Sequence, residues 1–137
     1  MEKKNIDWEN IGFGYIPTDK RFVANYKDGA WDEGGLTEDP NIVMNECAGV
    51  LQYAQTVFEG MKAYTTEDGH IVTFRPDLNA KRMVDSAKRL EMPPFPEDKF
   101  VDAIVQTVKA NEAYVPPYGT GAVSYTHLRA HETCADL

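Results

Sequence analysis

Near the end of the chain, the residues best suited to chemistry are His127, His131 and Cys134. The two histidines are four positions apart, so on a helix they would share one face with Cys134 close by. A structural zinc site needs four ligands, and a catalytic site needs three ligands with a supporting shell, which no other nearby Cys or His supplies. We therefore favour an unstructured C-terminus with incidental histidines over a metal site, and we expect no metal ligand in the chain.

The body of the chain lacks the usual signatures of phosphate loops and nucleophilic triads. It contains no Walker motif and no Gly-x-Gly-x-x-Gly sequence. Ser86 and His70 are the only serine and histidine within residues 1–122, so this part of the sequence does not indicate a Ser-His triad. Its acidic residues are scattered and form no evident metal site.

Three pieces of the body stand out by their order: YAQTVFEGMKAY (53–64), TFRPDLNAKRM (73–83) and VPPYGTGA (115–122). Each has a purely structural interpretation, as sheet core, a solvated helix face and a loop, respectively. On spacing alone these structural interpretations are favoured. The residues concerned are Tyr53 and Phe58 in the first piece, Arg75, Arg82 and the later Arg89 for the helix face, and Gly119 and Gly121 in the loop.

Short strands are expected to position the first of these pieces. Residues 12–31 mix aromatic and β-branched residues with turn signals, and they predict short strands joined by tight turns. Residues 32–41 are acidic and Gly-rich and predict a loop. The run ending in MKAY (61–64) and the run HIVTFR (70–75) flank a Gly-containing turn and predict a β-hairpin.

Two helices are expected to follow. From Pro76 the apolar residues recur at helical spacing, and Pro93-Pro94 ends the pattern. A second helix is predicted after Pro96 and is expected to continue to Pro116-Pro117. The predicted apolar stripes are Ala80, Met83, Val84, Ala87 and Leu90 on the first helix, and Phe100, Ile104, Val105 and Val108 on the second. A mostly antiparallel sheet followed by two helices is an α+β arrangement.

Composition excludes several classes of function. The chain has 137 residues, 42% of them hydrophobic, and a net charge of −8, which argues against nucleic acid and anionic membranes as partners. Two cysteines do not make a disulfide framework, and the start of the sequence has no secretory signal pattern. No apolar run is long enough to span a membrane. We expect a cytoplasmic protein with reduced thiols.

Taken together, the three pieces resemble the amino-terminal small domain of branched-chain amino acid aminotransferases, which are fold-type IV enzymes that depend on pyridoxal 5'-phosphate. The resemblance runs from about Asp7 to Ala122 and is carried by FEGMKAY, FRPDLNAKRM and VPPYGTG. FEG alone is shared with D-amino acid aminotransferases and aminodeoxychorismate lyase. The two longer signatures point to the branched-chain group.

The resemblance implies roles for individual residues. Arg82, in the AKRM part of the motif, matches the arginine that binds the cofactor phosphate, and a guanidinium suits that role because it presents a fixed fork of donors. Phe58 matches a wall of the substrate side-chain pocket. Tyr53 matches a second aromatic residue of that pocket, which in the family reaches the neighbouring subunit's site. The family therefore implies a homodimer or a larger assembly.

The sequence departs from the family pattern after Ala122. The family continues with a strand of the type Ser-Leu-Tyr-x-Arg-Pro, whereas this chain continues Val-Ser-Tyr-Thr-His-Leu-Arg, so no role is carried over to Tyr125 or Arg129. We expect residues 1–122 to be the small domain and residues 123–137 to be a non-family tail, disordered or derived from a sequencing adapter. The family lysine that forms the Schiff base lies in a second domain, so we expect no catalytic residue in this chain.

These expectations define one main hypothesis and two alternatives. In the first, the parent enzyme transfers the amino group of leucine, isoleucine or valine to 2-oxoglutarate, forming glutamate, and this fragment alone is inactive. In the second, the chain is a non-catalytic binding module that keeps the small-domain fold. Another fold-type IV enzyme also stays open as the parent, as do the preferred substrate and the biosynthetic or catabolic role.

Overall fold

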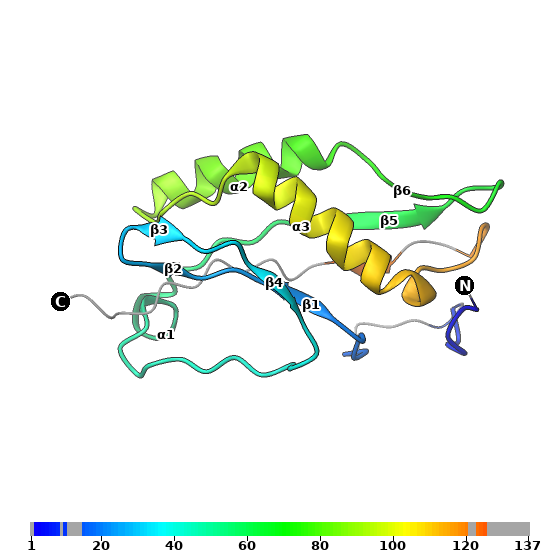
Figure 1. Ribbon diagram of the computed structural model, residues 1–137, viewed down its shortest axis with the longest axis horizontal. Coiled ribbons are helices and arrows are strands. Elements are labelled where there is room, and N and C mark those ends of the chain that lie inside the picture. Colours follow the sequence, from blue (N-terminus) through cyan, green and yellow to red (C-terminus); the bar gives the residue numbers. More distant parts are fainter. Residues whose placement is uncertain (1, 9, 11–14, 121–122, 126–137) are drawn as a thin grey trace.

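Two helices lie side by side along one side of the molecule in the computed structural model, which describes residues 2–8, 10, 15–120 and 123–125 (Figure 1). Helix α2 spans Pro76–Arg89 and helix α3 spans Glu97–Ala110, which confirms both predicted helices. Pro76 occupies the first turn of α2, where its missing N–H costs nothing, and acidic residues occupy the first turn of both helices.

Helix α3 ends earlier than expected. It stops at Ala110, and a 3₁₀ turn, η1, follows at Glu112–Tyr114 before the prolines. The reason is Asn111, whose buried side chain donates to the carbonyls of Thr107 (2.9 Å) and Lys20 (2.7 Å) and accepts from the N–H of Lys20 (3.0 Å). This side chain fixes the amino-terminal segment against the end of α3.

The predicted hairpin is present. Strand β5 (Met61–Thr65) pairs antiparallel with β6 (Ile71–Thr73), and Gly69 adopts a φ of 83° in the turn between them. On its other edge, β5 pairs antiparallel with β7 (Val123–Tyr125), so the order is β6-β5-β7 in the described part of the chain. Strand β7 falls in the segment expected to be a non-family tail. The later part of that segment, residues 126–137, lies outside the described residues.

Four short strands precede the hairpin, in two antiparallel pairs. Strand β1 (Arg21–Val23) pairs with β4 (Gly35–Thr37), and β2 (Tyr26–Lys27) pairs with β3 (Ala30–Trp31). The prediction of a loop over 32–41 was therefore wrong for 35–37.

The local cause of this difference is a turn built around Asp32. Its carboxylate accepts hydrogen bonds from the N–H groups of Asn25 (2.9 Å) and Gly34 (3.0 Å), and Gly34 adopts a φ of 66°. The turn returns the chain alongside β1, where Leu36 pairs with Phe22. Acidic and glycine-rich composition marked the turn but concealed the strand that follows it.

A five-residue helix, α1, spans Gly49–Tyr53 in a stretch for which no helix was predicted. Five residues are less than two turns, which is too short for a helical period to appear in the sequence. The helix ends at Ala54, which has a left-handed φ of 51°. In Figure 1, α1 lies apart from the layer formed by α2 and α3.

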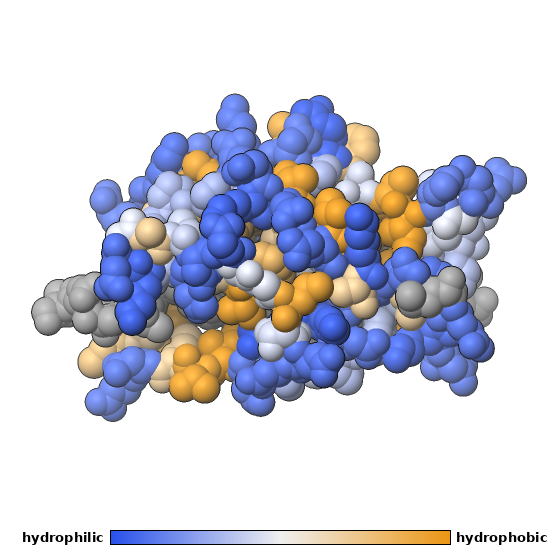
Figure 2. Space-filling view, in the orientation of Figure 1, coloured by the Kyte–Doolittle hydropathy of each residue, from blue (hydrophilic) through white to orange (hydrophobic). Residues whose placement is uncertain are grey.

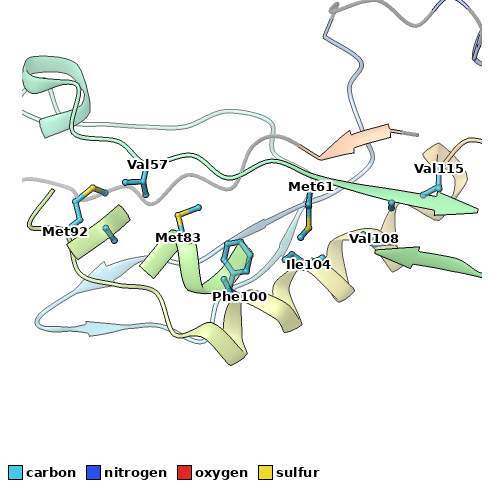
Figure 3. Packing of buried hydrophobic residues seen from close by; sticks show 11 residues of the cluster. Val57, Met61, Met83, Met92, Phe100, Ile104, Val108 and Val115 are labelled. Atoms are coloured by element: carbon cyan, nitrogen blue, oxygen red, sulfur yellow. The ribbon is translucent and has the colours of Figure 1, made fainter. Parts of the chain in front are cut away.

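The hydrophobic core lies between the two long helices and the segment that leads into β5. Figure 3 shows Met83, Phe100 and Ile104 directed toward Val57 and Met61. The predicted stripes are largely correct, but Leu90 and Val105 at their margins are exposed. The buried cluster comprises Val57, Met61, Ala63, Ala80, Met83, Ala87, Met92, Phe100, Ile104, Val108 and Val115.

The architecture is α+β, as expected, with small antiparallel sheets packed with helices. Hydrophilic residues cover much of the face shown in Figure 2, while hydrophobic residues show in its centre, at its right and at its lower left. Two α1 side chains, Leu51 and Tyr53, are exposed. Within the described residues, no helix has the length and apolar character that crossing a membrane requires.

Candidate functional site

A side-chain cluster joins the first two motif pieces. Arg82 of α2 donates from Nε to Oε1 of Glu59 (2.9 Å) and from Nη2 to Oε2 (2.9 Å), which makes a two-bond fork on one carboxylate. Asn79, one turn earlier on α2, donates to Oε2 of Glu59 (2.7 Å) and to the carbonyl of Gly60 (3.0 Å). The chain segment before β5 is thereby fastened to the middle of α2.

The alternation of the segment before β5 explains why Glu59 faces the helix. Val57, Met61 and Ala63 are buried, while Phe58 and Lys62 are exposed, so odd-numbered positions point toward the helices. Glu59 also occupies an odd-numbered position, so its side chain points toward the helices, and it is only 14% exposed. A carboxylate in this position needs partners, because burying an unpaired charge is costly. Asn79 and Arg82 are those partners.

The guanidinium group of Arg82 has one edge that is bonded to Glu59 and one edge that is accessible. Its hydrogen bonds to Glu59 raise the pKa of the guanidinium above its usual value, so the group stays charged. The fork uses Nε and one N–H of Nη2, which leaves three of the five donors, those of Nη1 and the second N–H of Nη2. Among the described residues Nη1 donates to no acceptor, and the side chain is 56% exposed.

The accessible edge of Arg82 fits a phosphate ester. Two parallel N–H groups in one plane match two oxygens of a phosphate, which is the strongest geometry that arginine offers to an anion. The chemistry of this donor set is therefore compatible with the phosphate group of pyridoxal 5'-phosphate. Arg82 is the residue that would hold it.

Phe58 and Tyr53 do not belong to the core. Their side chains are 66% and 85% exposed, so the interpretation of these rings as sheet core was wrong. Neither ring takes part in an aromatic pair among the residues that the structure describes. Phe58 directly precedes Glu59 in the sequence, so its backbone adjoins the cluster formed by Glu59, Asn79 and Arg82. Tyr53 is the last residue of α1, which is a separate element from the one that carries Arg82.

The other two arginines of the proposed helix face differ from Arg82. Arg75 precedes α2 and forms a fork with Asp77, in which both side chains are more than half exposed. Arg89, in the last turn of α2, is also exposed. The interpretation as a solvated face holds for these two arginines, whereas Arg82 is bonded to a largely buried carboxylate.

The third motif piece packs against the hairpin. Val115 and Pro116 are buried, and the carbonyl of Pro116 accepts a hydrogen bond from Oγ1 of Thr65 (2.6 Å) at the end of β5. Gly119 has a φ of 83° in the turn that follows. The three motif pieces therefore meet around β5, although they are far apart in the sequence.

The tail residues His127, His131 and Cys134 lie outside the described residues. Within the described ranges, no group of three His, Cys, Asp or Glu side chains is placed to hold a metal ion. Cys47 is a free, exposed thiol.

Sequence reasoning missed Glu59 and Asn79. Glu59 entered the sequence analysis only as part of FEG, and Asn79 only as part of FRPDLNAKRM. One signal was available for Glu59, because it is a charged residue at the inward parity of an otherwise apolar alternation, Val57 to Met61. A comparable signal marked Asn79, because it lies four residues before Met83 and is therefore a polar residue on the apolar face of α2, but its partner Glu59 could not be read from the sequence.

Comparison with known proteins identifies the relatives of this chain. No protein-family model matches it. The chain is 51% identical over 122 residues to a branched-chain-amino-acid aminotransferase of Haemophilus influenzae, covering 89% of this chain and 36% of that protein. It is 44% identical over 122 residues to the Helicobacter pylori enzyme of the same name, with the same coverage of both. A methionine aminotransferase of Arabidopsis thaliana is 43% identical over 120 residues, covering 87% of this chain and 34% of that protein.

These matches agree with the α+β architecture expected for the small domain of a fold-type IV aminotransferase. They also agree with the expectation of a partial chain, since the sequence spans 36% of the length of the first two curated relatives. Over 122 residues the chain is therefore similar to an amino-terminal portion of the branched-chain aminotransferases.

Proposed function

We propose that this chain is the small domain of a branched-chain aminotransferase and that its Arg82 binds the phosphate of pyridoxal 5'-phosphate. The observation that carries the proposal is the Arg82 guanidinium, whose inner edge is bonded to Glu59 and whose outer edge is exposed. The similarity to aminotransferases over 122 residues supports the same assignment.

In this proposal the parent protein transfers the amino group of leucine, isoleucine or valine to 2-oxoglutarate and releases glutamate. The cofactor, when bound, supplies the electron sink that such a transfer requires. The residues of this chain bind and orient rather than move protons. Arg82 holds the phosphate, while the exposed rings of Phe58 and Tyr53 form apolar walls for the substrate side chain.

The exposure of Phe58 and Tyr53 supports this division of labour. Large aromatic side chains that are exposed in one domain are suited to closing a pocket against another domain or subunit. The proposal therefore includes a parent that is a homodimer or larger, with the Schiff-base lysine in a part of the protein outside residues 1–137. It also keeps residues 1–122 as the small domain, residues 123–137 as a non-family segment whose strand β7 pairs with β5, and a cytoplasmic location.

A second candidate concerns the substrate alone. The methionine aminotransferase relative indicates that an unbranched apolar side chain is compatible with this sequence. A hydrophobic pocket discriminates weakly among apolar side chains, because one methylene changes binding by only about 1–3 kcal/mol. Steady-state rates of the parent with leucine, valine and methionine would distinguish the two candidates.

The test of the phosphate assignment uses the parent protein with Arg82→Ala and, as a matched control, Arg89→Ala on the same helix. Charge-assisted hydrogen bonds contribute about 1.5–3 kcal/mol each, so Arg82→Ala should weaken cofactor binding at least about tenfold. Arg89→Ala should not change it. The dissociation constant is measured by fluorescence titration of the apoprotein with pyridoxal 5'-phosphate. Equal affinities of wild type and Arg82→Ala would contradict the assignment.

A further inference from the structure

Glu59 has no role in the function proposed so far, yet it is the residue on which Arg82 depends. We propose that Glu59, itself held by Asn79, is a positioning residue that fixes the plane of the Arg82 guanidinium for a phosphate monoester. This inference rests on the proposed function, since it concerns the same phosphate site. It assigns the orientation of that site to two residues that do not touch the phosphate.

The first argument is the order of burial along the cluster. The Asn79 side chain is buried, Glu59 is 14% exposed and Arg82 is 56% exposed. Each residue is bonded to the next, from the core outward. Asn79 also donates to the carbonyl of Gly60, so the amide cannot rotate without losing a second bond. The rigid end of the cluster is therefore in the core, and the accessible end is the guanidinium.

The second argument is the choice of edge. The Glu59 carboxylate occupies Nε and one N–H of Nη2, both at 2.9 Å. Two bonds in one plane fix both the position and the rotation of a guanidinium, whereas one bond fixes only its position. The edge that remains, Nη1 with the second N–H of Nη2, is the one that a phosphate can bind through two parallel bonds. Glu59 thus determines which edge of Arg82 is presented to the ligand.

The third argument concerns charge. A carboxylate next to a phosphate site opposes the anion, so Glu59 cannot assist binding through its charge. Its contribution must be geometric, because a long arginine side chain loses much rotational freedom when it binds a ligand unless it is already ordered. Removing Glu59 therefore tests two opposite expectations. Geometry predicts weaker phosphate binding, and charge alone predicts tighter binding.

A matched pair near the start of the same helix lacks this arrangement. Arg75 forms a fork with Asp77 at similar distances, 2.9 Å and 2.7 Å. Asp77 is 58% exposed and lies two residues away in the sequence, so no buried group holds it. This pair provides the control, because Asp77→Asn removes an equivalent fork without affecting Arg82.

The experiment is a double-mutant cycle in the full-length parent protein: wild type, Glu59→Gln, Arg82→Ala and the combination. The glutamine side chain introduced by Glu59→Gln is isosteric with glutamate but has one acceptor oxygen, so it cannot serve both bonds of the fork. Affinity for pyridoxal 5'-phosphate is measured by fluorescence titration of the apoprotein, and affinity for inorganic phosphate alone by ³¹P NMR. Melting temperatures establish that each variant folds.

Because contacting residues couple, we expect Glu59→Gln to weaken the binding of both ligands about tenfold in the wild-type background and not at all in the Arg82→Ala background. Asp77→Asn should leave both affinities unchanged.

The outcomes separate the inference from the function on which it rests. Equal or tighter phosphate binding by Glu59→Gln overturns the positioning role, and so does an effect of equal size in the Arg82→Ala background. If instead Arg82→Ala itself binds the cofactor as tightly as wild type, the proposed function fails. Should Glu59→Gln fail to fold, Arg82→Lys replaces it, because an ammonium keeps the charge but cannot form the fork. Wild-type affinity in a folded Arg82→Lys variant would also overturn the inference.

Discussion

Asn79→Ala tests whether the cluster around Glu59 is anchored in the core. The substitution removes the amide that donates to Oε2 of Glu59 and to the carbonyl of Gly60, and it does so within α2, where alanine is a favourable residue. Any loss of stability therefore comes from the two hydrogen bonds and the space left behind, not from helix propensity. The perturbation isolates the inner end of the cluster.

The expected magnitude follows from the two bonds. The bond to the charged carboxylate, at 2.7 Å, contributes about 1.5–3 kcal/mol, and the bond to the neutral carbonyl, at 3.0 Å, about 0.5–1.5 kcal/mol. Arg82 still satisfies part of the carboxylate, and the gain in helix propensity offsets about half a kcal/mol. The free energy of unfolding should therefore fall by about 1.5–4 kcal/mol, which is large for one polar side chain.

The assay is urea unfolding of the 137-residue chain followed by tryptophan fluorescence, with Gln106→Ala as the matched control. Gln106 also donates a side-chain amide to a carboxylate, that of Asp102 at 2.6 Å, but on an exposed face of α3. Exposed pairs of this kind contribute only about 0.2–0.5 kcal/mol. The reasoning is refuted if Asn79→Ala costs less than about 1 kcal/mol, or if the two variants are destabilised equally.

Three further predictions concern the framework. Asn111→Ala should lower the free energy of unfolding by about 2–4 kcal/mol in urea titrations, because it leaves the backbone N–H and carbonyl of Lys20 without their partner. Met83→Ala should cost about 2–5 kcal/mol in the same assay, since its side chain fills the core between α2 and α3. The hydrogen bond from Tyr114 lowers the pKa of Asp19 in the folded protein. That bond therefore stabilises the fold at pH values above the unfolded carboxyl pKa of about 3.9. The stabilisation is lost as the pH falls through the lower pKa of Asp19 in the folded protein. Melting curves of Tyr114→Phe should therefore differ from wild type at neutral pH and converge with it in acid.

The parts of the fold that were predicted correctly are those with a repeated local signal. Helix α2 shows its apolar period over several turns and begins at a proline, and the hairpin has a glycine turn between two strand-like runs. The parts that were missed depend on one contact or one turn. Strand β4 exists because Asp32 bends the chain back along β1, and α3 ends early because Asn111 bonds to Lys20, distant in sequence.

The candidate site divides in the same way. Arg82 was singled out through the family resemblance, because it stands in the AKRM part of the motif. Its partner Glu59 lies 23 positions away in the sequence, and no periodicity relates the two residues. The exposure of Phe58 was equally hidden, since an aromatic residue in an alternating strand-like run is as consistent with the core as with the opposite face.

Stability alone does not account for the Arg82–Glu59 pair. An ion pair with an exposed partner contributes little to stability. Placing the Glu59 carboxylate on the side of the segment that faces the helices carries a desolvation cost. A hydrophobic residue at position 59 would continue the buried series of Val57 and Met61. Position 79 could then also hold an apolar residue, because no carboxylate would need its amide. The sequence instead places two polar groups against the core, and their combined effect is to hold one exposed guanidinium with an unused edge outward. The proposed phosphate site would account for this feature, because a surface cation that is held with an unused edge outward is suited to bind an anion.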